Sequence, residues 1–399
     1  MPMGNGWVTE MLWGFGKLFV HPLFYYSFFL CLVLGYRRVK RERKDFKIRV
    51  ESGYYELQQL LPLGVLLGLA LSIISLLSGI VIPFAAIILI GAITLLVSLT
   101  LNFRLLSPAY VIGTTIILLF FLYEQNINIP ILGQAMAELE QPLYPALAVI
   151  MGLLIIAEGI LIRQNAVHNT SPKLIQSNRG LTVGVHESKR IWMVPFFLFV
   201  PGGELTAPFE WWPVFAIGEN LTVTPLLVPF LIGFSQQVQS KLPYEAIRLN
   251  GLQVVALGIL VSSAAISSIW SPIYSVIAAA IAIFGRELIS FLQMTLEKQK
   301  PFYFSQSDQG VLILGITPYS PAEKMGLQVG EVIKKVNGRS VRTESELYEA
   351  LQSNRAHCKL EVYGINNELR FEQRALFEGE HHELGILFVQ DKRRVKQAG

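Results

Sequence analysis

The chain has 399 residues, of which 52% are hydrophobic and only 16% are charged, and its formal net charge is +4. Soluble domains carry about 25% charged residues, so this deficit favours a membrane protein. The charged residues are also unevenly distributed, because 27 of the 62 lie within 300–399. We therefore predict an α-helical polytopic membrane bundle over 1–298 and a soluble α+β domain over 300–391, followed by a basic tail at 392–399.

The composition excludes several classes of protein. The small basic excess lies beside apolar segments, where the positive-inside rule accounts for it, so it does not indicate nucleic-acid binding. Cys31 and Cys358 cannot form a disulfide framework and lack metal-ligand spacing. The N-terminus has neither the basic start nor the small-residue cleavage site of a signal peptide. We expect no cofactor, no metal and no small-molecule substrate.

Apolar segments of membrane-spanning length follow one another along the chain. A bilayer core of about 30 Å requires about 20 apolar residues as a helix. Prolines interrupt the stretch 191–235, which we interpret as two short or broken spans, with a re-entrant hairpin as the alternative. The predicted set of about nine spans is 18–36, 60–79, 83–101, 107–123, 143–162, 191–206, 222–236, 249–267 and 270–285.

The charges of the connections orient these spans. The connections at 124–141, 201–221 and 268–269 contain no Lys or Arg, whereas the alternate connections are basic. By the positive-inside rule, this alternation predicts an external N-terminus and a cytoplasmic C-terminal domain, in a multi-pass protein of the cell membrane.

The first connection, 37–49, carries eight Lys or Arg residues. Juxtamembrane basic residues contribute about 1 kcal/mol each at an anionic membrane surface. One interpretation is a loop that only sets the topology; the other is a patch that binds lipid or a partner protein. The residues of that patch would be Arg37, Arg38, Lys40, Arg41, Arg43 and Lys44.

Two features inside the spans need an explanation. Glu158 lies near the end of a span, within two turns of Arg163, so we expect an ion pair at the membrane interface. Gly64, Gly68 and Ser72 have the spacing that permits close helix packing, although many membrane helices show this spacing by chance.

Catalytic motifs are absent from the sequence. A zinc protease requires two His residues one helical turn apart beside a Glu, and His186-Glu187 lacks the second His. Neither a Gly-x-Ser-x-Gly sequence nor a phosphate-binding Gly-rich loop occurs. We therefore predict that the protein has no catalytic residues and is not an enzyme.

The soluble domain contains the most specific pattern in the chain. We predict strands at 310–316 and 331–336, and further strands near 358–364 and 368–375. A short helix begins at Ser320-Pro321, and a second helix begins at Thr343, with Glu346 as its capping-box partner.

The sequence SPAEKMGLQVGEVIKKVNG (320–338) resembles the PDZ domain, and the likeness extends over about 302–391, with Glu331 where that family usually has Asp. A late Leu-Gly-Ile segment is similar to the last strand of circularly permuted bacterial PDZ domains. The resemblance implies a carboxylate-binding loop at 380–385 and a groove strand at 386–389, with the loop at 303–310 as its competitor. A peptide would add to that strand, beside the helix, and the implied contact residues are Leu384, Gly385, Ile386, Leu387, Phe388, Leu347, Ala350 and Leu351.

The whole chain is similar to one family. HPLFYY (21–26) before the GYRRVKRERKDF junction (35–46), further spans and a terminal PDZ-like domain resemble the MinJ-type cell-division topological determinants. The resemblance implies a non-enzymatic adaptor for division-site selection that bridges a MinD-like inhibitor to a DivIVA-like polar scaffold and contacts divisome membrane proteins. It also implies enrichment at septum and poles.

Two classes compete with the adaptor hypothesis. The first is a regulatory subunit of an intramembrane or membrane-associated protease, since such proteins carry PDZ-like domains. The second is a transporter with a sensory PDZ domain, suggested by the proline-interrupted stretch 191–235.

Overall fold

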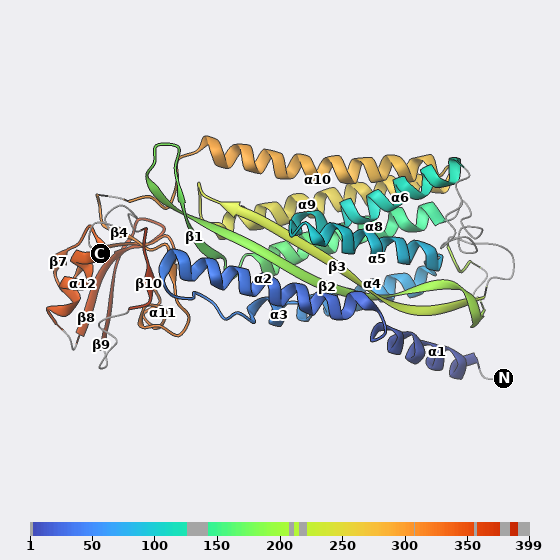
Figure 1. The fold of residues 1–399 in the computed structure, drawn as a ribbon, viewed down its shortest axis with the longest axis horizontal. Helices are drawn as coiled ribbons and strands as arrows, with labels where there is room; N and C mark the ends of the chain where they lie inside the picture. Colours follow the sequence, from blue (N-terminus) through green and yellow to red (C-terminus); the bar gives the residue numbers. More distant parts are fainter. Residues whose placement is uncertain are drawn as a thin grey trace.

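A computed structural model describes residues 3–125, 143–206, 211–214, 222–306, 308–354, 357–375 and 384–389. Figure 1 shows a long region of roughly aligned helices with a smaller domain packed against one end, and the N-terminus lies at the opposite end. We call the end nearest the small domain the domain-proximal end.

The long region is mostly helical. Proline occupies one of the first two positions of α2, α4, α6 and α9, where its missing N–H group costs nothing. Each of the seven predicted spans outside the proline-rich stretch overlaps a helix, although several helices extend beyond the predicted bounds. The elements are α1 (Met3–Leu18), α2 (Pro22–Phe46), α3 (Tyr55–Gln59), α4 (Pro62–Ser78), α5 (Phe84–Leu99), η1 (Phe103–Leu106), α6 (Pro108–Glu124), α8 (Leu143–Leu161), η2 (Ile162–Ala166), α9 (Pro243–Ile266), η3 (Ser267–Ile269) and α10 (Ile273–Gln299).

The helices carry apolar side chains on their outer faces. On α4, for example, Leu66, Leu69, Ile73 and Leu77 are exposed, which is the surface expected of a protein that contacts lipid. Within the described residues, four helices are long and apolar enough to cross a membrane, or five if the bent pair α1–α2 counts as one span. The apolar helices α5 and α6 are shorter.

The proline-rich stretch is not helical, so the prediction of two short or broken helical spans at 191–206 and 222–236 is wrong. The chain does double back here, as in the alternative of a hairpin, but it does so as two long strands. Both segments belong to an antiparallel sheet of order β1-β2-β3, composed of β1 (Ser171–Gln176), β2 (Thr182–Leu205) and β3 (Val223–Val238). The two long strands run side by side along the helices (Figure 1).

The prolines fit this sheet because of their positions in its register. Pro195 lies opposite Pro229, and Phe199 lies opposite Pro225. In β2 the odd-numbered residues direct their backbone groups away from β3, as shown by the bonds that Met193 and Phe199 make to other elements. Proline is tolerated where an N–H group points away from the partner strand, so these prolines interrupt no ladder bond.

Helix α4 and its neighbours cover the free edge of β2. The N–H of Met193 donates to the Leu60 carbonyl over 3.0 Å, and the N–H of Phe197 donates to Ser72 Oγ over 3.0 Å. Phe199 exchanges bonds with Ile80 and Ile82 over 3.1 and 2.8 Å. The edge of the sheet is therefore satisfied by protein, as a low-dielectric environment requires.

The small residues of α4 permit this contact. A Cβ atom on Gly64 would lie 2.1 Å from the carbonyl oxygen of Met193, and one on Gly68 would lie 2.1 Å from that of Pro195. The predicted close packing is real, but the partner is a strand edge and not a second helix.

An ion pair is buried between the helices. Arg286 on α10 contacts Glu158 on α8, with Nη2 2.9 Å from Oε1, and the Ser107 hydroxyl donates to the same carboxylate. Both charged side chains are at most 1% exposed. Glu158 therefore pairs with Arg286 and not with Arg163, the neighbour suggested by the sequence.

The C-terminal domain contains two small sheets around its own core. One sheet has the order β4-β6-β8-β9 with β7 attached to β6, and the other pairs β5 with β10. Thr343 and Ser320 cap the two helices as predicted, because their hydroxyls accept the N–H groups of Glu346 and Glu323. The elements are β4 (Val311–Leu312), β5 (Gly315–Ile316), α11 (Pro321–Lys324), β6 (Val332–Val336), β7 (Arg339–Ser340), α12 (Glu344–Gln352), β8 (His357–Tyr363), β9 (Leu369–Ala375) and β10 (Ile386–Leu387).

Candidate functional site

The short strand β10 has one paired edge and one edge that faces a groove. The carbonyl of Gly385 accepts the Thr317 N–H over 2.8 Å, on the side of β5. Antiparallel strands alternate bonded and non-bonded pairs, so the N–H and C=O groups of Ile386 point away from β5. An extended peptide could bond to this edge as an added strand.

The groove has a volume of about 430 Å³. Four predicted residues line it, namely Gly385, Ile386, Leu387 and Phe388. The loop residues 317–320 and the first residue of α11, Pro321, also line it.

The predicted helix residues do not line the groove. Leu347, Ala350 and Leu351 are at most 2% exposed and pack with Leu384 in the core of the domain. Helix α12 instead contributes Glu344 and Tyr348 to the groove, and neither was among the predicted contact residues. Their spacing of four residues places both on one helix face beside the apolar face, and that periodicity was the available signal.

Gly385 has a backbone conformation that favours glycine, with φ of +78°. A Cβ atom there would lie 2.3 Å from both Ser320 Cβ and Thr317 Oγ1. The position is therefore crowded as well as left-handed, and substitution would disturb the groove backbone itself. The rest of the predicted carboxylate loop, 380–383, and the basic tail, 392–399, lie outside the described residues.

The competing loop, 303–310, joins the domain to the long region. The N–H of Tyr303 donates to the Gln239 carbonyl, and the N–H of Gly184 donates to the Phe304 carbonyl, each over 2.8 Å. Phe304 is fully buried. Tyr303 and Phe304 are therefore engaged in contacts that join the two regions.

A third wall of the groove comes from the residues that follow α2. Phe46, Ile48 and Arg49 line the same cavity as β10 and α12. Leu387 and Val389 pack with Phe46 in a shared apolar cluster. The groove is therefore built jointly by the C-terminal domain and the end of the first long helix.

His186, near the start of β2, makes a second link between the regions. Its Nε2 lies 2.8 Å from the Leu314 carbonyl oxygen, and its Nδ1 lies 2.9 Å from Thr170 Oγ1. Burial lowers the pKa of this imidazole to about 4, so it is neutral near pH 7. In the described part of the chain, no group of three or more His, Cys, Asp or Glu residues is placed to hold a metal ion.

The six residues of the predicted basic patch divide into two sets. The segment is not a loop, since α2 continues as a helix to Phe46. Arg38 is buried, with Nε 3.1 Å from Glu56 Oε1, and Arg41 forms an ion pair with Glu187. The exposed members are Arg37, Lys40, Arg43 and Lys44.

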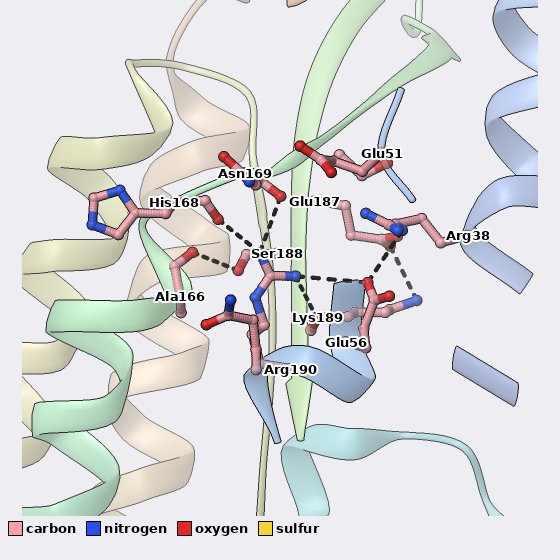
Figure 2. A network of polar contacts seen from close by, with 12 residues as sticks. Arg38, Glu51, Glu56, Ala166, His168, Asn169, Glu187, Ser188, Lys189 and Arg190 are labelled. Carbon is pink, nitrogen blue, oxygen red and sulfur yellow. Dashed lines mark hydrogen bonds and ion pairs between the residues drawn. The ribbon is translucent and has the colours of Figure 1, made fainter. Parts of the chain in front are cut away.

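Arg38 belongs to a network of polar contacts at the domain-proximal end (Figure 2). Arg190 Nη2 donates to the carbonyls of His168 and Asn169 over 2.7 and 3.0 Å. Its Nη1 lies 3.8 Å from Glu56 Oε1, so Glu56 lies between Arg38 and Arg190. Figure 2 shows these side chains converging from α2, α3 and β2.

A region of apolar helices that ends in a domain with a strand-edge groove defines a membrane-associated protein-interaction module. Residues 312–363 match the family model of the PDZ domain. The chain is 42% identical to the cell division topological determinant MinJ of Bacillus subtilis, over 98% of both chains. It therefore belongs to the MinJ family of cell division topological determinants.

Other comparisons differ in their coverage. A probable cell division topological determinant MinJ of Lacticaseibacillus paracasei is 24% identical over 94% of this chain and 98% of its own. Serine protease HTRA3 of Mus musculus is 38% identical, but only over 17% of this chain and 15% of its own. The likeness to proteases is thus distant and partial. No solved structure matches the chain.

Proposed function

We propose that this protein is a non-enzymatic membrane adaptor in division-site selection, whose C-terminal groove binds an extended peptide. The observation that supports this most directly is the edge of β10, whose outward backbone groups face a groove of about 430 Å³. Membership of the MinJ family supports the role in cell division. By resemblance, the partners are a MinD-like inhibitor, a DivIVA-like polar scaffold and divisome membrane proteins.

In the proposed mechanism, a peptide adds to β10 through the N–H and C=O groups of Ile386. Tyr348 on α12 provides an aromatic contact, and Arg49 provides a cation for an acidic group of the peptide. Because Arg49 follows the first long helix, the anchored chain contributes directly to recognition.

Attachment of the groove to membrane helices determines where its partners gather. A groove fixed to a membrane protein confines its partners to the membrane plane and raises their effective concentration. We propose that the domain lies in the cytoplasm and that the protein gathers at septum and poles.

The adaptor proposal is tested in cells. A fluorescent fusion of the full chain should gather at septa and poles, and a strain without the protein should form filaments or minicells. A chain that lacks 300–399 should still insert, but it should fail to recruit at least one partner. Normal division with this truncated chain would contradict the proposal.

The proposed orientation has its own test. A cysteine in place of Asn128 should react with a membrane-impermeant maleimide in intact cells, and a cysteine in place of Ser177 should not. Labelling at position 177 alone would reverse the orientation.

A further inference from the structure

A second cavity, of about 290 Å³, lies at the domain-proximal end, away from the peptide groove. It is many times larger than the roughly 30 Å³ that one water molecule occupies. Leu34, Leu101 and Phe103 form its apolar part, at the level where the apolar stretches of α2 and α5 end. We call it the basic pocket, and its charged or polar lining residues are Arg37, Arg38, Arg41, Glu56, Ser171, Lys173, Glu187, Lys189 and Arg190.

The lining of the basic pocket contains six cationic side chains and two carboxylates. Glu187 is shared by Arg41, Lys173 and Lys189, with the two lysines 4.0 and 3.2 Å away. Three further acids lie nearby. Glu42 lies 3.9 Å from Arg38 Nε and also accepts the N–H of Val50 and the hydroxyl of Ser171. Asp45 accepts the N–H of Leu174, and Glu51 accepts the N–H of Ser52.

The guanidinium groups retain unused donors. Arg38 is 6% exposed, and among the described residues its Nη1 has no hydrogen-bond partner. The Nε atoms of Arg41 and Arg190 are likewise buried and unpartnered in the described part of the chain. Buried donors in folded proteins nearly always find a partner, so these three nitrogens indicate a missing acceptor.

Two lysines in the pocket, Lys173 and Lys189, have lowered pKa values. Both pKa values are lowered first by burial and then by the positive charge of Arg41. A bound anion would relieve this repulsion. Arginine forks match the oxygens of a phosphate group, and lysines add point charges.

We infer that the basic pocket binds a phosphate group, which the headgroup of an anionic phospholipid supplies. The apolar part of the pocket, formed by Leu34, Leu101 and Phe103, would contact the glycerol and the first acyl carbons. The site is separate from the peptide groove, so it does not depend on the proposed adaptor function.

The test uses the full chain in neutral detergent. Dioctanoyl phosphatidylglycerol, dioctanoyl phosphatidylcholine and glycerol phosphate are titrated, and bound ligand is measured by native mass spectrometry. The pocket variant Arg37→Gln/Lys173→Gln/Lys189→Gln removes three lining charges. The control variant Lys40→Gln/Arg43→Gln/Lys44→Gln removes three exposed charges that do not line the pocket.

We expect phosphatidylglycerol to bind at least tenfold more weakly to the pocket variant and less than threefold more weakly to the control. The variant Lys173→Arg/Lys189→Arg keeps the charges and should retain binding. The melting temperature of each protein without ligand confirms that it is folded.

Three results would overturn the inference. Equal losses of affinity for phosphatidylglycerol in the pocket and control variants would show that the lipid is attracted to the basic surface as a whole and not to the pocket. Equal binding of phosphatidylcholine would show that the negative charge is not recognised. Tighter binding of glycerol phosphate than of phosphatidylglycerol would identify a soluble phosphate ester as the ligand instead of a lipid.

Discussion

The strand edges of the long region and of the C-terminal domain differ: one is covered by a helix, and the other faces a groove. In the long region, the outer edge of β2 is covered by α4, and its donors reach Leu60, Ser72 and Ile80. In the C-terminal domain, the outer edge of β10 faces a groove. A covered strand edge is part of the architecture, whereas an edge that faces a groove remains able to bind another chain.

The largest expected effect concerns the covered edge. Gly68→Ala places a Cβ atom against the Pro195 carbonyl, so α4 must move away from β2. We expect a loss of about 3 kcal/mol in the free energy of unfolding, measured by denaturant titration in detergent. Gly16→Ala is the matched control, since no atom lies within 4 Å of its added Cβ. Equal stability of the two variants would mean that α4 does not press on the strand.

A smaller loss of stability is expected when the Ser72 hydroxyl, which bonds to the same edge of β2, is removed. Ser72→Ala removes the acceptor of the Phe197 N–H and leaves that partly buried donor without this partner. We expect a loss of about 2 kcal/mol in the same assay. Ser78→Ala removes an exposed hydroxyl that bonds only within its own helix, and it should change stability by less than about 0.5 kcal/mol. If the two serines behaved alike, the edge of β2 would not depend on the side chain of α4.

The groove edge is tested by binding instead of stability. A peptide selected on the full chain from a library of C-terminal peptides should bind Tyr348→Ala about tenfold more weakly, as fluorescence anisotropy would report. Phe371→Ala removes a similarly large ring from exposed strand β9 and should bind normally. Unchanged affinity in Tyr348→Ala would place the peptide elsewhere.

The smallest effect concerns the junction between the regions. Because burial lowers the pKa of His186 to about 4 from 6.5, the solvated imidazole binds a proton before the buried one does. The contact between the regions is therefore fully stable above pH 6.5 and weakens as the pH falls toward 4.

Between pH 7.5 and 5.5, this linkage costs about 1.3 kcal/mol, or about tenfold in protection of the Gly184 amide, which bonds to Phe304. Hydrogen exchange read by mass spectrometry, corrected for intrinsic rates, provides the measurement. His186→Phe should abolish the pH dependence, and its persistence in that variant would exclude His186 as the cause.

The sequence predicts the helices and the small domain well because each has a local signal. Apolar runs give the helix positions, and the capping residues Ser320 and Thr343 give the helix starts of the domain. A hairpin was the alternative for the stretch 191–235, but its strands were not predicted, because a continuous apolar run does not distinguish a buried strand from a helix. The prolines Pro195, Pro225 and Pro229 all have odd numbers, so in two paired strands they fall at positions that make no ladder bond; this spacing was the available signal for strands.

The site was predicted only in part, for a similar reason. The strand side of the groove, including Gly385 and Ile386, follows from a local motif. The wall formed by Phe46 and Arg49 depends on a contact between residues more than 300 positions apart, which no local pattern encodes. The basic pocket likewise combines side chains from α2 and β2 that meet only in the folded chain.

The length of the hairpin has a mechanical consequence. The 16 residues of β3 extend about 53 Å at about 3.3 Å per residue, which exceeds the roughly 30 Å of a bilayer core. Strand β2 pairs regularly with β3 from Pro201, near its far end, to His186, whose ring is bonded to Leu314 in the PDZ domain. Because β2 pairs with β3 without a register shift from His186 to Pro201, a displacement of β2 along its own length would also displace the residue that contacts the PDZ domain.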